Sequence, residues 1–118
     1  KRGQTLQTYD VIMTGDLGKI GLKILVTMFA QSGVKKEDLA RFRDAGAEFF
    51  GEDSSFQAGA SGAGCSAAVY SSYVLEQFKT GRYKKVLLVA TGALLSPLSF
   101  QQGQTIPCTA HAVEIGMG

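Results

Sequence analysis

The sequence predicts an α/β fold with some parallel strand pairing. Two short apolar segments, Tyr9 to Thr14 (YDVIMT) and Lys85 to Thr91 (KVLLVAT), are typical of strands that are covered on both faces. Between them lie longer segments whose apolar residues recur with helical spacing. Strands that are separated by helices in this way favour a sheet with parallel pairs and helices packed on it.

The composition indicates one globular domain and narrows the classes of partner. The 118 residues are 45% hydrophobic and 19% charged, which is ordinary for a globular protein. A net charge of +2 with scattered Lys and Arg predicts no nucleic-acid partner. Cys65 and Cys108 are too few for a disulfide framework and fit a reducing, cytoplasmic-type compartment. The apolar runs are too short for a transmembrane segment.

The first half of the chain predicts one strand and two helices. After the Tyr9 to Thr14 strand, Gly15-Asp16 turns the chain, and the Asp16 carboxylate is a suitable N-cap for a helix over Leu17 to Ser32. The apolar stripe of this helix consists of Leu17, Ile20, Ile24, Leu25, Met28 and Phe29, and Gly33 follows as the C′ residue. A second helix is expected from Glu37 or Asp38 to about Ala45, ending near Gly46. Residues 48–58 form a loop or a partly helical connection.

The second half predicts a long helix and two strands. The helix begins at Ser61 or Gly62 and runs to about Thr80, with Gly81 beyond it, and Val69, Tyr73, Val74 and Phe78 form its apolar stripe. Lys85 to Thr91 is a central strand. Residues 92–107 contain both prolines and form a loop, and Cys108 to Gly116 is the last strand.

The stretch GASGAGCS, Gly59 to Ser66, is the densest cluster of small residues. It matches a phosphate-binding loop except that Cys65 replaces the lysine that pairs with phosphate. It also fails as a nucleophile elbow, because Ala63 replaces the final glycine of G-x-S-x-G. Two compatible interpretations stay open: dense packing of a helix start in the centre of the domain, or ligand contact with free helix N–H groups.

Cys65 and His111 are the candidate nucleophile and base. Cys65 could act as a nucleophile if it lay at a helix start near a base. If Cys108 to Gly116 is a strand, Cys108 and His111 point to opposite faces and form no metal or catalytic pair. His111 shares a face with Val113 and Ile115, so we expect it in the core or in an interface.

The segment GASGAGCSAAVYSSYVLEQFKTGRYKKVLLVATGALLSP resembles the carboxyl-terminal half of the thiolase-like superfamily. More specifically, TGDLGKIG, GASGAGCSA and IPCTAHAVEIG resemble a family of sporulation proteins from spore-forming bacteria within that superfamily. The resemblance implies a layered fold with a mixed sheet covered by helices. It also implies that residues 1–118 are a carboxyl-terminal (sub)domain, and the ends of the chain, Lys1-Arg2 without Met and Gly116-Met117-Gly118, fit a piece of a longer protein.

The resemblance implies binding rather than catalysis. Active condensing enzymes carry a histidine where Gly15-Asp16-Leu17-Gly18 stands here, and an asparagine or histidine near the place of Ala60. A site without these groups cannot polarise a thioester carbonyl as the superfamily's chemistry requires. The alternative is an acyltransferase or condensing enzyme whose nucleophile comes from the absent amino-terminal half, with Cys65 or His111 contributing from this chain.

The resemblance also implies a ligand and its surroundings. The sporulation family binds dipicolinic acid and acts peripherally at the spore or forespore membrane with membrane proteins of the same operon, which implies roles in uptake, sporulation and germination. We expect no cofactor of its own, calcium only together with dipicolinate, and a homodimer. The resemblance places ligand contacts at the turns Gly15 to Gly18 and Gly59 to Gly62 and in the loop after Thr91. Helix capping is the favoured role of Asp16. The candidate ligand-binding residues are Gly15, Asp16, Gly59, Ala60, Ser61 and Gly62.

Overall fold

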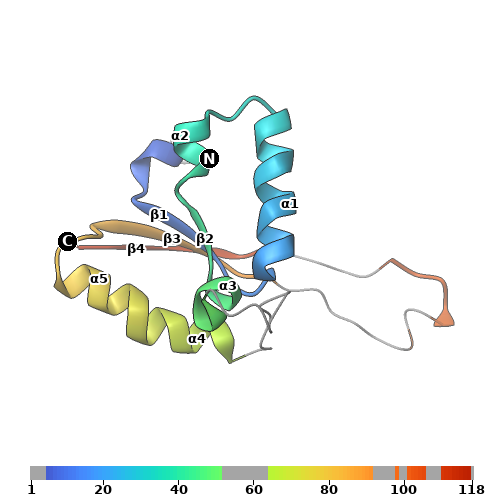
Figure 1. Ribbon diagram of the computed structural model, residues 1–118. Helices are drawn as coiled ribbons and strands as arrows, with labels where there is room; N and C mark the ends of the chain where they lie inside the picture. The colour runs from blue at the N-terminus through green and yellow to red at the C-terminus, as the bar shows by residue number, and fades with distance from the viewer. Residues whose placement is uncertain (1–4, 52–63, 92–97, 99–100, 106–109, 118) are drawn as a thin grey trace.

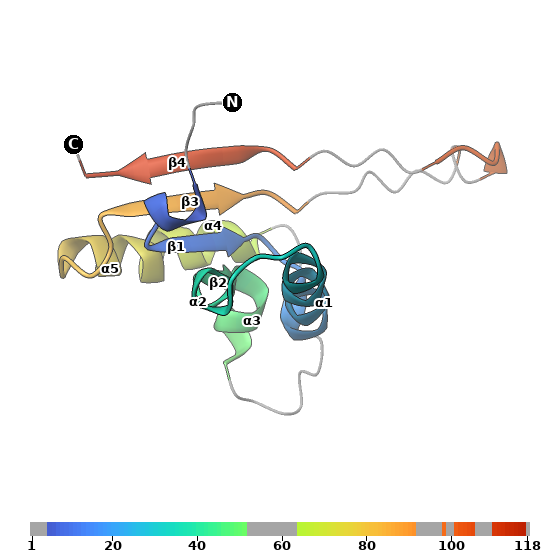
Figure 2. The same cartoon turned by 90° about the horizontal axis from the view of Figure 1, so that it is seen from above.

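The computed structural model describes residues 5–51, 64–91, 98, 101–105 and 110–117. Its centre is a four-stranded mixed sheet in the order β2-β1-β3-β4, as Figure 2 shows from above. Three strands are parallel, β2 (Phe42–Asp44), β1 (Val11–Thr14) and β3 (Lys85–Val89), whereas β4 (Ala112–Gly116) runs antiparallel to β3. Helices lie on both sides of the sheet (Figure 1), so the predicted α/β class is confirmed.

The two predicted central strands form the middle of the sheet. All four residues of β1 are buried, and Ile12 pairs with Phe42 on one side and with Leu87 on the other. Consecutive apolar residues suit this position because both faces of the strand are covered. β3 starts at Lys85 as expected and ends at Val89, two residues earlier than the predicted bound.

One helix, α1 (Gly18–Gln31), packs on the first face of the sheet together with the short 3-10 helix η1 (Leu6–Thr8). The predicted end of α1 is confirmed: Gly33 has φ +87°, and its N–H donates to the carbonyl of Ala30 while the N–H of Val34 donates to that of Phe29. This pair of hydrogen bonds is the Schellman motif, which needs a left-handed residue that glycine supplies without strain.

The prediction of a second helix from Glu37 or Asp38 to about Ala45 is wrong. The chain instead forms α2 (Lys36–Leu39), then β2, then α3 (Ala45–Phe50). The segment has helical propensity, but Phe42 and Asp44 are buried and Arg43 between them is exposed, which is the alternation of a strand. Parallel pairing of Phe42 with Ile12 therefore overrides the local preference. The helical part of the predicted connection over residues 48–58 belongs to α3.

A helical segment from Cys65 to Lys79 covers the second face. It comprises α4 (Cys65–Val69), the π-helical turn η2 (Tyr70–Val74) and α5 (Leu75–Lys79). Three stripe residues, Val69, Val74 and Phe78, are buried as predicted. The first two are five residues apart, and a π-helical turn with its i to i+5 period lets both face the sheet. The predicted Gly81 terminates the helix with φ +74°.

The start of this helix differs from the expected dense packing. Gly64 is the N-cap residue and Cys65 is buried, but Gly64, Ala67 and Ala68 are exposed. The packing interpretation is therefore correct only for the side of the helix that faces the sheet. Residues 61–63, where the helix was predicted to begin, lie outside the described residues.

The last strand is present but shorter than predicted. β4 begins at Ala112, and Val86 and Leu88 of β3 pair with Ile115 and Val113. Within the predicted loop over residues 92–107, the N–H of Gln102 donates to the carbonyl of Leu98 at 3.0 Å. Across the described part of the chain, no helix combines the length and the apolar character that crossing a bilayer requires.

Candidate functional site

A large cavity lies on the α1 face of the sheet. Its volume is about 710 Å³, which falls within the usual range of small-molecule sites. Apolar side chains form most of its wall, with two aromatic rings, Phe29 and Phe42, whose centroids are 5.1 Å apart. The remaining apolar lining residues come from η1, α1, the strands and the segment before β4: Leu6, Ile12, Leu17, Leu25, Leu87, Val89, Ala90 and Ala110.

The polar end of the cavity is formed by Thr14, Asp16 and Thr91. Thr14 is the last residue of β1, Asp16 follows in the next turn, and Thr91 lies just beyond β3. Because β1 and β3 are parallel and adjacent, their carboxyl ends meet at the same edge of the sheet. This edge is where open α/β sheets usually bind ligands.

The turn after β1 is fixed against Thr91. The N–H of Asp16 donates to the Thr91 hydroxyl oxygen at 2.7 Å. A Cβ atom on Gly15 would lie 2.9 Å from the same oxygen, so the close approach requires glycine. The hydroxyl oxygen is thereby used as an acceptor, and none of the hydrogen bonds among the described residues uses its proton. Thr91 can therefore donate a hydrogen bond into the cavity.

A buried carboxylate, Asp44, joins three elements at this end of the sheet. Its side chain is completely buried at the end of β2. One oxygen, Oδ2, accepts from the N–H of Leu17 at 2.8 Å and from the Thr14 hydroxyl at 2.6 Å. The other, Oδ1, accepts from the N–H groups of Gly18 at 2.9 Å and Ala47 at 3.0 Å. Asp44 therefore holds the starts of α1 and α3 against the end of β1.

The predicted capping role of Asp16 is corrected by this arrangement. The N-cap position of α1 is occupied by Leu17 and not by Asp16. The apolar side chain of Leu17 makes no capping hydrogen bond. The first N–H groups of the helix bind Asp44 instead, from 26 or 27 residues further along the chain. A carboxylate at this place satisfies orphan donors and interacts favourably with the helix dipole.

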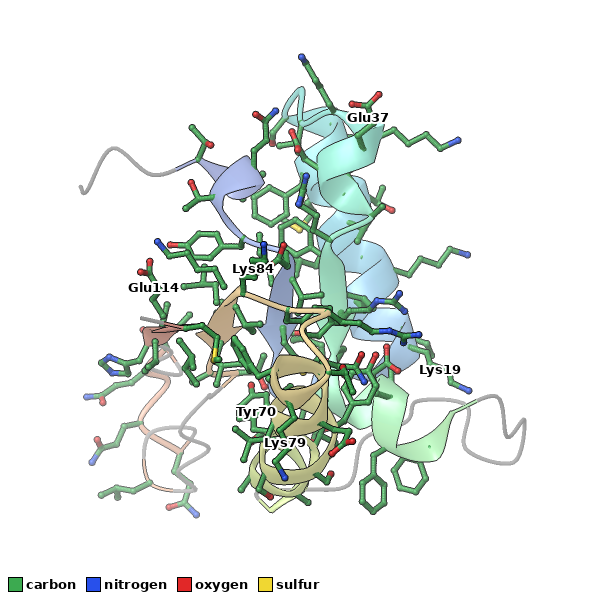
Figure 3. The ribbon with its side chains drawn as sticks, turned by 90° about the vertical axis from the view of Figure 1, so that its left-hand side faces the viewer. Lys19, Glu37, Tyr70, Lys79, Lys84 and Glu114 are labelled. Carbon is green, nitrogen blue, oxygen red and sulfur yellow. The ribbon has the colours of Figure 1, made fainter. Side chains whose placement is uncertain are left out.

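Figure 3 places Tyr70 on the side of the Cys65–Lys79 segment that faces the sheet. Burial raises the pKa of Tyr70, and the nearby Asp44 and Cys65 raise it further. Its phenol therefore stays protonated at neutral pH. Tyr70 packs against the core that contains Cys65, Val69 and Val74, so it is on the opposite face of the sheet from the cavity.

The described residues do not form a metal site. They contain no group of three or more His, Cys, Asp or Glu side chains that could hold an ion. At the polar end of the cavity, both oxygens of Asp44 are already used by four donors. Asp16 with two threonine hydroxyls falls short of the six to eight oxygen ligands that calcium takes. The side chains found here thus do not fit a resident calcium ion.

Comparison with known proteins identifies the family. The family model described as Stage V sporulation protein AD matches residues 1–116. The chain belongs to the stage V sporulation protein AD family. A curated relative of that name from Bacillus subtilis (strain 168) is 39% identical over 110 residues, which are 93% of this chain. The match spans only 32% of the relative, so the chain corresponds to about a third of its length.

The family match confirms the sporulation family that the sequence motifs indicated, and the structure locates part of the predicted site. Gly15 and Asp16 lie together at the polar end of the cavity, beside Thr91. Gly59, Ala60, Ser61 and Gly62 lie outside the described residues. The described end of that stretch is nevertheless close, because a Cβ on Gly15 would be 3.7 Å from the Cβ of Ser66.

Sequence reasoning missed Asp44 and Thr91 and misplaced His111. Asp44 was assigned to the interior of a helix. Aspartate is a usual N-cap residue, and Asp44 caps α3 by accepting a hydrogen bond from the N–H of Ala47. Thr91 was assigned to the end of a strand. His111 is exposed and precedes β4, so it is not in the core of this chain, and its alternative place in an interface stays a prediction. Cys65 is a free thiol that is only 4% exposed, in the core of the other face.

Proposed function

We propose that the protein to which this chain belongs binds dipicolinic acid without catalysis during sporulation. In this proposal the ligand occupies the polar end of the α1-face cavity, between Thr91 and the turn at Gly15 and Asp16. The observation that carries the proposal is the chemistry of this end. Its described lining offers a hydroxyl donor, apolar walls and one carboxylate, that of Asp16, but no imidazole or thiol of the kind that acyl transfer uses as base or nucleophile.

The shape and polarity of the cavity suit a flat aromatic acid. Apolar walls that include the rings of Phe29 and Phe42 favour a ligand with an aromatic ring over a fully polar one. The Thr91 hydroxyl can donate to a carboxylate oxygen, and the volume of about 710 Å³ is ample for a ligand of this size. Ser66, at the start of the Cys65–Lys79 segment, lies beside the same turn.

The charge of Asp16 is the main constraint on this assignment. A dianion next to a carboxylate requires positive charge nearby, and the described lining contains no Lys or Arg. We therefore propose that the compensating charge comes from a calcium ion bound together with dipicolinate, or from the part of the polypeptide outside the matched third. Adding and removing calcium separates these two sources.

The wider role follows from the family. We propose that the protein acts peripherally at the forespore membrane, as a homodimer, with membrane proteins of the same operon that carry dipicolinate into the forespore. Germination of the spore would depend on the same stored ligand. These relationships rest on the resemblance of the sequence motifs and on the family match.

Isothermal calorimetry of the full-length protein with dipicolinate tests the proposal directly. We expect heat of binding, measured with and without calcium, and a shift of the apparent affinity with calcium if the ion accompanies the ligand. The absence of heat at millimolar dipicolinate under both conditions contradicts the proposal. Incubation with acyl-CoA followed by intact mass measurement tests the acyltransferase alternative, for which a stable acyl adduct would be the signature.

A further inference from the structure

Helix α1 is apolar on two sides rather than one. Its inner residues, Leu22, Leu25, Val26 and Phe29, pack against the core that contains Tyr9, Ile12 and Phe42. Its polar side chains are confined to one row with a spacing of four residues: Lys19, Lys23, Thr27 and Gln31. Figure 3 shows Lys19 pointing away from the sheet. A surface helix usually carries polar residues over its whole outer side.

The second apolar side of α1 faces solvent in this structure. Ile20, Ile24 and Met28 are 58%, 56% and 61% exposed, and their spacing of four residues places them in a single row along the helix. We call these three residues the outward row. β-branched isoleucine is a poor choice for an exposed helical position, so helix propensity does not explain it.

The helical segment on the other face provides an internal contrast. Its exposed positions are mostly small or polar, for example Ala67, Ser71, Ser72 and Glu76. The exposed row of large apolar side chains is therefore particular to α1, where no described element covers it (Figure 1). Contiguous apolar surface of this kind usually marks an interface.

The length of the relative indicates what covers this row. This chain matches 32% of the relative, so about two thirds of the length of that protein lies outside the match. A surface within the same polypeptide is present at high effective concentration and is reached without the entropy cost of bringing two molecules together. We propose that, in the full-length protein, the outward row of α1 packs against polypeptide outside the matched third.

Photo-crosslinking in the full-length protein tests this proposal. p-Benzoylphenylalanine is introduced in place of Ile24, and in a control in place of Lys36, an exposed residue of α2. After irradiation in the presence of vesicles containing anionic lipid, mass spectrometry identifies the crosslinked partner. We expect an intramolecular crosslink from position 24 to a peptide outside the matched third, and no such crosslink from position 36.

Other crosslinks from position 24 contradict the proposal. A covalent dimer would assign the outward row to a second copy, a lipid adduct would assign it to a membrane surface, and no adduct would leave it in solvent. A matched pair of variants gives an independent readout. Ile24→Glu should lower the midpoint of thermal unfolding of the full-length protein by about 3 °C or more, and Lys23→Glu should leave it within about 1 °C. Equal shifts in both variants overturn the proposal.

Discussion

The two faces of the sheet differ in how completely they are packed. On the face of the Cys65–Lys79 segment, Met13 and Val86 are fully buried and Val74 is 1% exposed. On the α1 face, the same strands present Ile12, Leu87 and Val89 to a cavity of about 710 Å³ whose end is polar. Alternate residues of β1 and β3 thus build a closed core on one side and the wall of a candidate site on the other.

The largest expected effect is at the carboxylate that organises the open face. Asp44→Ala leaves three N–H groups at the starts of α1 and α3 without their acceptor and leaves the Thr14 hydroxyl only the carbonyl of Arg43, so it should lower the free energy of unfolding by about 4 kcal/mol. Urea unfolding measures the loss. Asp44→Asn keeps the shape of the side chain and should lose less, because one amide oxygen still accepts. A change below 1 kcal/mol in Asp44→Ala would contradict the joining role of Asp44.

A matched pair of truncations compares the two faces. Met13→Ala removes a fully buried side chain from the closed core and should lower the free energy of unfolding by about 3 kcal/mol. Leu87→Ala enlarges a cavity that is already open and should cost only about 1 kcal/mol. Chemical denaturation of both variants gives the comparison. Equal losses would mean that the α1 face is as tightly packed as the other.

A smaller effect is expected at the polar end of the cavity. Thr91→Val removes the hydroxyl that accepts from the N–H of Asp16 and that we propose as a donor to the ligand. Dipicolinate affinity of the full-length protein should fall about tenfold, while Thr91→Ser should restore it. Thr80→Val, at the end of α5, is the control and should bind as the wild type does. Undiminished binding by Thr91→Val would remove this hydroxyl from the site.

The smallest effect lies at Asp10, at the opposite end of the strands. Its carboxylate accepts from the N–H groups of Lys84 at 2.7 Å and Lys85 at 2.8 Å, and these hydrogen bonds lower the pKa of Asp10 below its ordinary value of 3.8. A lowered pKa stabilises the fold above pH 3.8, and this contribution disappears as the pH falls through the pKa of the folded state.

Asp10→Asn should therefore cost about 0.5 kcal/mol at pH 7, a small value because the side chain is exposed. Urea unfolding of the variant and the wild type at pH 7 and pH 2 measures the difference between them. We expect this difference to shrink at pH 2, because the stabilising contribution is lost as the pH falls toward and through the lowered pKa of Asp10 in the folded state. A difference that is constant across this range would exclude ionisation as its cause.

The sequence was most informative where local and tertiary preferences agree. The apolar runs of β1 and β3, the stripe of Val69, Val74 and Phe78 and the two terminating glycines predicted their elements well. β2 was missed because its residues favour a helix locally and become a strand only by pairing with β1. The apolar stripe predicted for α1 divides into an inner row and the outward row, which spacing alone could not separate.

The candidate site was only partly predictable for a related reason. Gly15 and Asp16 were predicted as a turn because they follow an apolar strand directly, but their ligand role was implied only by the resemblance to the thiolase-like superfamily. Asp44 and Thr91 bind the turn and the start of α1 from 27 and 75 residues away, so no local pattern links them to it. Their roles depend on parallel pairing that brings the ends of β1, β2 and β3 to one edge of the sheet.

The central claim is that the open, polar-ended face of the sheet is the ligand site. It is tested most directly by calorimetric titration of dipicolinate into two full-length variants that carry the same substitution. Val89→Trp fills the cavity, whereas Val113→Trp adds the same bulk on β4 facing the other side of the sheet. The account predicts at least a tenfold loss of affinity for Val89→Trp and wild-type affinity for Val113→Trp. Wild-type affinity in both variants, or a loss confined to Val113→Trp, would contradict it.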